Sequence, residues 1–148
     1  ELATSAPSHD WLSITGGAIG QGMPCSIGAA IACPHRPVIN FQADGSAMYT
    51  VQALWTQARE GLNITTLICS NRTYNILRIE MAHAGQTPPG KVGLDLTDLT
   101  RPPINWVQIS KGMGVPAVSV TTAEQLAIEL SRALSESGPH LIDMIFSG

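Results

Sequence analysis

The sequence predicts an α/β fold, a three-layer, doubly wound and mainly parallel sheet with helices on both faces. Two observations carry this prediction. Short apolar, β-branched runs alternate along the chain with segments of helical periodicity. Residues 64–70 form a near-continuous run of apolar and β-branched side chains, as in a parallel strand that is buried on both faces. The 148 residues suit a single domain spanning 1–148, and no internal repeat is visible.

Turn and capping residues bound the predicted elements. Pro24 suits the first turn of a helix, Gly61 suits a helix end, and Thr122 with Gln125 matches a capping box. The expected strands cover residues 11–15, 38–43, 64–70, 115–120 and 141–146. The expected helices cover residues 25–33, 49–60, 74–84, 104–113 and 123–137. Residues 85–103 are rich in Gly, Pro and Asp, which predicts a functional or mobile loop.

The composition limits the classes of partner. Charged residues make up 13% of the chain, against the roughly 25% of an average protein. Either a partner domain or subunit covers part of the surface, or the domain is compact and rich in Ser, Thr and Gln. The net charge is −3 and there is no basic run, so nucleic acid is not expected as a partner. No apolar run approaches the roughly 20 residues that span a bilayer, so no membrane partner is expected.

The three cysteines bear on the compartment. Cys25, Cys33 and Cys69 are an odd number and lie in apolar segments. They lack the close paired spacing of a zinc site, and we expect them to be reduced core thiols. With no signal peptide visible, this predicts a cytoplasmic protein.

Residues 38–46 carry most of the functional information. An apolar strand ends on Asp44, and Gly45 and Ser46 follow directly before a helix. A carboxylate in this place suits a divalent cation, and a helix N-terminus suits a phosphate group. Asp is also a favoured helix cap, so this stretch alone leaves a cap and a metal ligand equally open.

Asn71 adds a second half to this arrangement. It ends the next expected strand, 27 residues after Asp44. A strand–helix–strand crossover takes roughly 30 residues, which places both side chains at the same edge of the sheet on adjacent or near-adjacent strands. A carboxylate, an amide oxygen and a main-chain carbonyl such as that of Thr73 suit Mg²⁺. The chain has no P-loop, and Cys25 stands where a dinucleotide fingerprint needs its third glycine.

These residues resemble the thiamine diphosphate motif, which reads Gly-Asp-Gly, a spacer and Asn-Asn. The two halves here are Ala43-Asp44-Gly45-Ser46 and Ser70-Asn71-Arg72-Thr73-Tyr74. The glycine-rich turn 16–24 and the segment 46–55 are similar to the matching parts of acetolactate synthases and benzoylformate decarboxylases. The resemblance covers nearly the whole chain. It implies the C-terminal pyrophosphate-binding domain of such an enzyme, without the pyrimidine-binding and middle domains.

The resemblance implies a role for each matching residue. Asp44 and Asn71 match the side-chain ligands of Mg²⁺, and Thr73 matches the main-chain carbonyl ligand. Gly17 matches the residue whose carbonyl accepts from the cofactor's 4′-amino group, and Ile19 matches the apolar residue that holds the cofactor bent. The residues expected to contact the cofactor are Gly17, Ala18, Ile19, Asp44, Gly45, Ser46, Asn71, Thr73, Tyr74, Asn75 and Ile76.

Four positions depart from the family pattern. Ala43 replaces the first glycine and Ser70 the first asparagine, but neither matches a metal ligand. Leu77 stands where pyruvate decarboxylases carry a glutamate, and Glu80 stands where acetolactate synthases often carry a tryptophan. The resemblance therefore favours a 2-keto acid decarboxylase or carboligase of the benzoylformate decarboxylase or acetolactate synthase type.

In the family, the glutamate that protonates the pyrimidine ring belongs to a pyrimidine-binding domain, usually on another subunit. No segment here matches that domain. We therefore expect no catalytic residue in this chain, no turnover of substrate by it alone, and a homo- or hetero-oligomer. The chain is then a fragment or one subunit of a split enzyme.

Alternatives and secondary predictions stay open at this point. Asp44 could be a helix cap or a phosphoacceptor of a non-catalytic α/β domain, although the clustered acidic residues and strand-end lysine of a phosphoacceptor site are not apparent. Residues 85–103 are a candidate lid over the cofactor. His83 lies near the expected site, but a core or surface role is the simpler interpretation.

Overall fold

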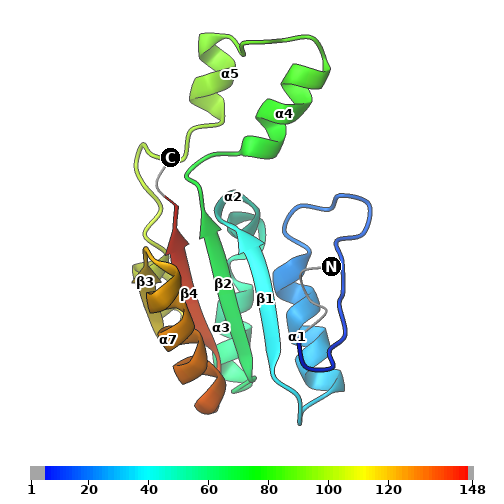
Figure 1. Ribbon diagram of the computed structural model, residues 1–148, viewed down its shortest axis with the longest axis vertical. Coiled ribbons are helices and arrows are strands. Elements are labelled where there is room, and N and C mark those ends of the chain that lie inside the picture. Colours follow the sequence, from blue (N-terminus) through cyan, green and yellow to red (C-terminus); the bar gives the residue numbers. More distant parts are fainter. Residues whose placement is uncertain (1–5, 147–148) are drawn as a thin grey trace.

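Four parallel strands form one sheet in the order β1-β2-β4-β3 (Figure 1). The strands are β1 Val38–Ala43, β2 Ile64–Ser70, β3 Ala117–Val120 and β4 His140–Ile145. The computed structural model describes residues 6–146. The predicted fold class is confirmed, and the first two strands begin and end at the predicted residues.

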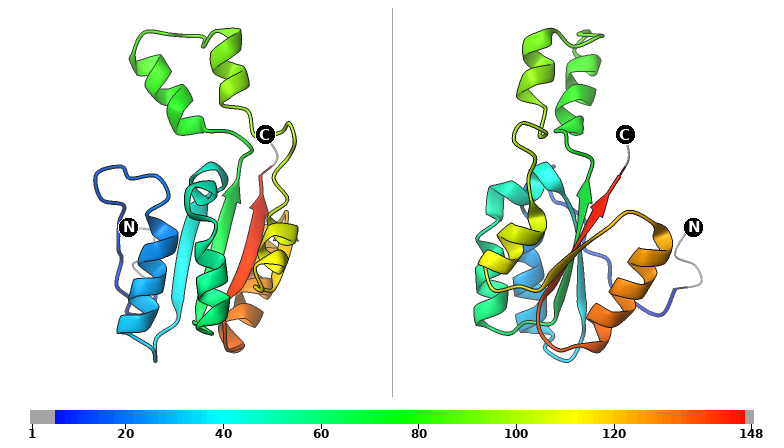
Figure 2. Two further views of the ribbon diagram at one scale, coloured as in Figure 1. Left: turned by 180° about the vertical axis from the view of Figure 1, so that it is seen from behind. Right: turned by 90° about the vertical axis from the view of Figure 1, so that its left-hand side faces the viewer.

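Helices cover both faces of the sheet (Figure 2). One layer holds α1 Gly22–Ala32, α3 Ala53–Arg59 and α6 Trp106–Gly112, and the other holds α7 Ala123–Ser135. The short helix α2 Asp44–Ala47 and the 3₁₀ turn η1 Met48–Thr50 follow β1 directly. Two further helices, α4 Asn75–His83 and α5 Lys91–Leu96, project beyond the carboxyl ends of the strands (Figure 1).

The core has two halves, one on each side of the sheet. Ile68 belongs to the cluster with Leu54 and Trp106 under α1, α3 and α6. Leu67, its neighbour in β2, belongs to the cluster with Ile142 under α7. Successive side chains of a strand point to opposite faces, so β2 is buried on both sides, as its apolar run predicts.

The strand β1, in contrast to β2, is buried on one face only. Its polar residues Asn40 and Gln42 are buried, while Ile39 and Phe41 are 42% and 56% exposed. Gly22 permits the close approach of α1, because a Cβ there would lie 2.3 Å from the Gln42 side chain. The outward face of β1 is therefore an apolar surface that the described residues leave largely uncovered.

Residues 11–15 form no strand, contrary to the prediction. Hydrogen-bonded partners, not local propensity, decide whether a short apolar segment becomes a strand. Trp11 is 73% exposed, and its ring centroid lies 6.4 Å from that of Phe41.

Two other expectations need correction. The helix expected over 49–60 is divided between η1 and α3, and the loop expected over 85–103 contains α5. Gly93 lets α5 approach α4, because a Cβ there would lie 3.1 Å from the Met81 sulfur.

The cysteines are free thiols, but they are not all in the core. Cys25 and Cys33 are exposed and Cys69 is half-buried. An apolar helix segment does not by itself tell which of its faces is buried, and both exposed cysteines lie on the outer side of α1 or just after it. No helix within residues 6–146 is both long and apolar enough to cross a membrane.

Candidate functional site

The predicted site residues gather where β1 and β2 end. The two strands are adjacent and parallel, and the last pair in their register is Ala43 with Cys69. Asp44 follows β1 by one residue and Asn71 follows β2 by one residue. The crossover spacing thus brings both side chains to the same edge of the sheet, where open α/β sheets bind their ligands.

The carboxylate of Asp44 is held by backbone donors from both strand ends. The Gly45 N–H donates to Oδ1 at 2.9 Å, and the Arg72 N–H donates to Oδ2 at 2.7 Å. Asp44 is 2% exposed, and burial raises the pKa of its carboxyl group, while these two hydrogen bonds oppose that rise and the Asp143 carboxylate adds to it. Each oxygen keeps a lone pair that a cation can use.

Asp44 is the first residue of α2 and lies one position after the N-cap, which Ala43 occupies. Its Oδ1 accepts from the Gly45 N–H in the first turn of the same helix, and its Oδ2 accepts from the Arg72 N–H in the loop after β2. The carboxylate therefore joins the loop after β2 to the end of β1.

The loop from Asn71 to Tyr74 is fixed in an uncommon backbone conformation; we call it the metal loop after the Mg²⁺ ligands that the sequence predicts there. Arg72 has φ +58°, in the left-handed region that costs an L-residue about 1–2 kcal/mol. Its carbonyl accepts from the Leu99 N–H at 2.9 Å, and the Tyr74 N–H donates to the Thr97 carbonyl at 2.9 Å. The Thr73 carbonyl takes part in neither bond, and the Asn71 Oδ1 accepts only a 3.0 Å bond from the Thr73 N–H. Both oxygens therefore have capacity left for a metal ion.

Ser46 links the glycine-rich turn to the start of α2. Its Oγ accepts from the Gly20 N–H at 2.9 Å and from the Gln42 side-chain amide. With both acceptor sites used, its own hydrogen is available to donate to an anion. The Gly20 carbonyl in turn accepts from the Thr50 hydroxyl at 2.8 Å. These bonds bring the segment of Gly17, Ala18 and Ile19 to the same edge of the sheet; Gly17 and Ala18 are exposed and Ile19 is half-buried.

Tyr74 packs on the backbone of Gly45. A Cβ at Gly45 would lie 2.4 Å from the tyrosine ring, so only glycine leaves the ring its place. Burial raises the pKa of Tyr74, and the charges of Tyr49 and Asp44 add to that rise. Asn75 and Ile76 begin α4 and are exposed above the strand ends.

Asp143 is a site residue that sequence reasoning missed. It lies on β4, next to β2, and is 6% exposed. The Ser70 hydroxyl donates to its Oδ1, and the Ser119 hydroxyl donates to its Oδ2 at 3.3 Å. Burial raises the pKa of Asp143, and these hydrogen bonds partly offset the rise. A lone acidic residue inside the apolar run 141–146 was the available signal.

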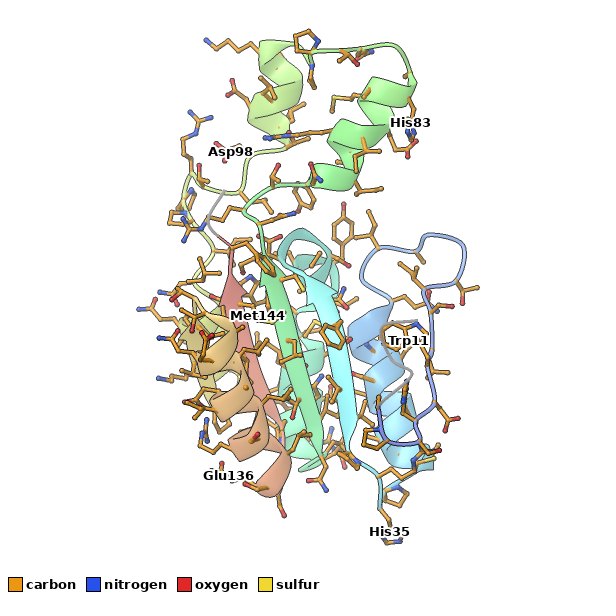
Figure 3. The ribbon with its side chains drawn as sticks, viewed as in Figure 1. Trp11, His35, His83, Asp98, Glu136 and Met144 are labelled. Carbon is orange, nitrogen blue, oxygen red and sulfur yellow. The ribbon has the colours of Figure 1, made fainter. Side chains whose placement is uncertain are left out.

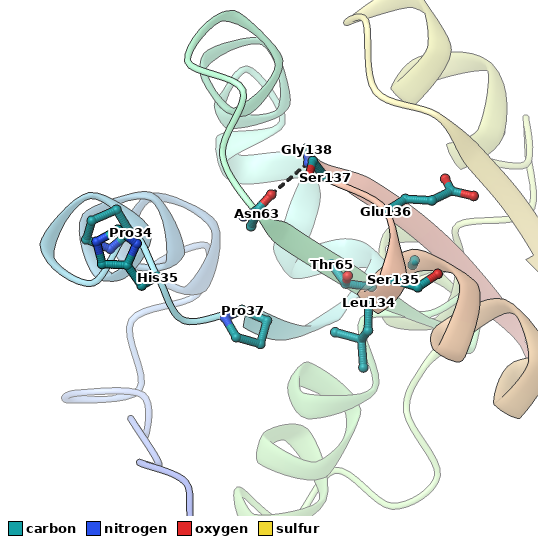
Figure 4. A pocket seen from close by; sticks show the side chains of 11 residues that line it. Pro34, His35, Pro37, Asn63, Thr65, Leu134, Ser135, Glu136, Ser137 and Gly138 are labelled. Carbon is teal, nitrogen blue, oxygen red and sulfur yellow. Dashed lines mark hydrogen bonds between the residues drawn. The ribbon is translucent and has the colours of Figure 1, made fainter.

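A small cavity of about 50 Å³ connects the two buried carboxylates. Asp44, Asp143, Ser70 and Trp106 all line it. The larger hollow, about 350 Å³, lies at the opposite, amino ends of the strands and is lined mainly by turn residues (Figure 4). It contains Asn63, whose Oδ1 accepts from the Gly138 N–H at 2.7 Å, but none of the predicted site residues.

His83 does not join the site. Its side chain is 70% exposed on α4, beside Glu80 at 3.5 Å, away from the strand ends (Figure 3).

The donor set fits Mg²⁺ better than a softer metal. Among residues 6–146 there is no group of three or more His, Cys, Asp or Glu side chains that could hold a metal ion. The oxygens of Asp44, Asn71 and Thr73 include one charged ligand and two neutral ones. Mg²⁺ commonly binds through one or two carboxylates, with substrate phosphates and waters completing six oxygens.

Comparison with known proteins yields consistent relatives. The chain is 53% identical over 146 residues to a putative acetolactate synthase large subunit, IlvX, from Mycobacterium tuberculosis, covering 98% of this chain and 28% of that protein. It is 36% identical over 129 residues to benzoylformate decarboxylase from Pseudomonas aeruginosa, covering 86% of this chain and 23% of that protein. The structure of a thiamine diphosphate-dependent 4-hydroxybenzoylformate decarboxylase from Rhodococcus jostii superimposes with a TM-score of 0.78 at 32% identity, covering 87% of this chain and 23% of that one.

The chain therefore spans about a quarter of the length of these three relatives. Residues 2–144 match the family described as thiamine pyrophosphate enzyme, C-terminal TPP binding domain. This match covers nearly the whole chain, and the parallel sheet with its polar strand ends agrees with it. The chain belongs to the C-terminal, thiamine pyrophosphate-binding domain family of the thiamine pyrophosphate enzymes.

Proposed function

We propose that this chain holds Mg²⁺ and the diphosphate end of thiamine diphosphate in an enzyme that decarboxylates or ligates a 2-keto acid. One observation carries the proposal: Asp44 and Ser46, in α2 directly after β1, and Asn71, in the loop directly after β2, lie at the ends of two adjacent parallel strands. The family match and the relatives support the cofactor. When bound, thiamine diphosphate supplies the electron sink for loss of carbon dioxide.

Each residue has a defined part in this proposal. The oxygens of Asp44, Asn71 and the Thr73 carbonyl hold the metal. The Ser46 hydroxyl donates to a diphosphate oxygen, and its two accepted hydrogen bonds fix it for that task. The glycine-rich turn, tied to Ser46 through Gly20, meets the pyrimidine side of the cofactor.

We also propose that turnover needs a pyrimidine-binding domain that carries the catalytic glutamate, within an oligomeric, cytoplasmic enzyme. The length of the relatives supports this, since this chain spans about a quarter of them. The exposed apolar face of β1, with Ile39 and Phe41, supports it as well, because such a face suits contact with another part of a protein.

Calorimetric titration tests the proposal. Thiamine diphosphate is titrated into the 148-residue chain with and without Mg²⁺, for wild type and for Asp44→Ala. We expect binding that requires Mg²⁺ and that Asp44→Ala abolishes, with no turnover of benzoylformate or pyruvate by the chain alone. The titration is repeated with an added pyrimidine-binding domain from a relative. Absence of binding in both settings contradicts the proposal.

A non-catalytic role with Asp44 as phosphoacceptor is the weaker candidate. An acceptor carboxylate must be reached by a phosphodonor, and Asp44 is 2% exposed with both oxygens already accepting N–H bonds. Treatment of the chain with acetyl phosphate, followed by mass spectrometry, is expected to leave Asp44 unmodified.

A further inference from the structure

The carboxylate of Asp143 lies deep in the sheet, where a charge needs a reason. Asp143 lies on β4, one of the two central strands of the sheet, and is 6% exposed. No lysine, arginine or histidine forms an ion pair with it among the described residues. Its two hydrogen-bond partners are hydroxyl groups on the two strands that flank β4, Ser70 on β2 and Ser119 on β3. The Arg72 guanidinium lies near enough to lower the pKa of Asp143, and burial raises that pKa by more. The structural role of this carboxylate therefore depends on what its two hydroxyl partners connect.

Ser70 connects this carboxylate to the metal loop. It is the last residue of β2 and directly precedes Asn71. Its backbone carbonyl accepts from the Phe146 N–H at 3.1 Å, so both the main chain and the side chain of Ser70 are anchored to the last strand. The chain leaves the sheet at the next residue and turns through the left-handed Arg72 to reach Asp44. A displacement of Ser70 would therefore also displace Asn71 and Arg72, which follow it in the chain.

We propose that Asp143 is a positioning residue for the metal loop: through the Ser70 hydroxyl it fixes the end of β2 and so sets where Asn71 and the Arg72 N–H lie relative to Asp44. Asp143 touches neither metal nor cofactor in this role. Its effect on cofactor binding rests on the function proposed above, whereas its effect on the loop does not.

The cavity beside Asp143 is consistent with this role. It has about 50 Å³, is lined by both buried carboxylates and by Trp106, and is large enough for an ordered water. Trp106 is 1% exposed, and its buried Nε1 atom has no hydrogen-bond partner among the described residues. A water that accepts from this N–H and donates to a carboxylate would satisfy the indole and stiffen the same corner.

The chain offers matched variants for a test. Ser70→Ala removes the link to the metal loop, and Asp143→Val removes the acceptor. Ser119→Ala removes the other hydrogen bond on the same carboxylate, on the side away from the loop. Asp143→Asn keeps a side-chain oxygen that can accept from Ser70 and so serves as the conservative rescue.

The first readout is amide hydrogen exchange in the full chain without cofactor. The reporter is the Arg72 N–H, which donates to Asp44, and the internal reference is the Ile68 N–H in the middle of β2. We expect Ser70→Ala and Asp143→Val to speed Arg72 exchange about tenfold relative to Ile68, the factor that loss of one hydrogen bond to a charged group can produce in a local opening. Ser119→Ala and Asp143→Asn should leave the ratio within about twofold.

The second readout is the Mg²⁺-dependent affinity for thiamine diphosphate by calorimetry. Ser70→Ala and Asp143→Val should weaken it by about 10- to 100-fold, the range for residues that orient a metal ligand. The double variant should be no weaker than the worse single variant, because both changes break the same link.

The outcomes separate the two proposals. Equal changes at Arg72 and Ile68 would mean that Asp143 supports the fold generally, and they would overturn the positioning role; so would unchanged Arg72 exchange in Ser70→Ala. If wild type binds no thiamine diphosphate even with a pyrimidine-binding domain present, the proposed function fails, and the exchange ratio alone still decides the role of Asp143. Ser70→Ala removes a single hydroxyl, so it keeps the test valid if Asp143→Val does not fold.

Discussion

The two ends of β2 look alike in sequence and differ in almost every physical respect. An asparagine flanks each end, Asn63 before the strand and Asn71 after it, and each end lies beside a hollow. At the amino end the hollow is large and lined mainly by turn residues. The hollow at the carboxyl end is seven times smaller (50 against 350 Å³). It is lined by two buried carboxylates and by Arg72, whose backbone is in the left-handed region.

This difference shows which signals mark a site. The larger hollow lies at the end of the sheet that holds none of the predicted site residues. Buried charge and local backbone strain both cost stability, and they persist only where the surrounding structure supports them. Both features occur together at the carboxyl end.

The two asparagines should separate function from stability. Asn71→Ala should weaken Mg²⁺-dependent binding of thiamine diphosphate on the order of a hundredfold, since residues that only support a metal ligand already cost about 10- to 100-fold. Asn63→Ala should leave binding unchanged and cost about 1 kcal/mol of stability, because it loses its bond to the Gly138 N–H. Calorimetry and urea unfolding measure the two effects. Similar loss of binding in both variants would remove the distinction between the two ends.

Gly45 should tolerate no side chain. Gly45→Ala places a Cβ 2.4 Å from the Tyr74 ring, so the ring or the backbone must shift, at a cost of about 1–3 kcal/mol. The shift would also displace the metal loop and weaken cofactor binding. Gly28→Ala is the control: its Cβ would meet nothing within 4 Å, and alanine favours the helix α1. Urea unfolding should show opposite signs for the two variants, and equal signs would be inconsistent with a steric cause at Gly45.

The backbone strain at Arg72 can be measured by comparison with Gly61, which has the same backbone conformation near the amino end of β2. Gly61 precedes β2 with φ +59° and Arg72 follows it with φ +58°, and a Cβ at Gly61 would meet no atom within 4 Å. Gly61→Ala should therefore cost about 1 kcal/mol and Arg72→Gly should gain about as much, because the first places a side chain in the left-handed region and the second removes one from it. Arg72→Ala removes the guanidinium but keeps the strain, so it should gain little. If Ala and Gly at position 72 were equally stabilising, the guanidinium and not the backbone would be the cause.

The carboxylates of Asp143 and Glu136 should change the free energy of unfolding with pH in opposite directions. Burial raises the pKa of Asp143 in the folded state above its ordinary 3.8. The stability that this shift contributes is fully present below pH 3.8, and it is lost as the pH rises through the folded-state pKa. The hydrogen bonds from His140 and Arg132 lower the folded-state pKa of Glu136 below its ordinary 4.5. Its contribution is present above that pH and is lost as pH falls through the folded pKa.

Urea unfolding between about pH 3 and about pH 7 measures both effects. Wild type should lose stability relative to Asp143→Asn as the pH rises, and it should lose its advantage over Glu136→Gln as the pH falls. The Glu136 effect should be the smaller and should shrink with salt, because its side chain is 48% exposed. If the stability difference from wild type changed with pH in the same direction for Asp143→Asn and Glu136→Gln, the expected contrast between the two carboxylates would be contradicted.

Local sequence patterns predicted most of the scaffold. The strands β1 and β2 begin and end at the expected residues, and α7 begins at the expected residue with the Thr122 side chain accepting from the Gln125 N–H. The side chain of Gln125 accepts from the Thr121 N–H and not from the Thr122 N–H, so the predicted capping box forms in half. The separation of Asp44 from Asn71 predicted their shared edge, because one crossover length has few solutions in a parallel sheet. The helix α5 was missed because its six residues lie among Gly and Pro residues and form against α4.

The sequence by itself determined the alternating strands and helices, the residues that end β1 and β2, and the resemblance of those ends to a thiamine diphosphate site, since all of these rest on residue types and their spacing along the chain. Only the tertiary structure decided that the Asp44 carboxylate joins two strand ends, that β1 leaves an apolar face largely uncovered, and that the Ser70 hydroxyl donates to Asp143, 73 residues away. The reason is physical. Each of these features depends on which distant backbone donor, strand or hydroxyl group becomes a neighbour, and only the order β1-β2-β4-β3 fixes that choice.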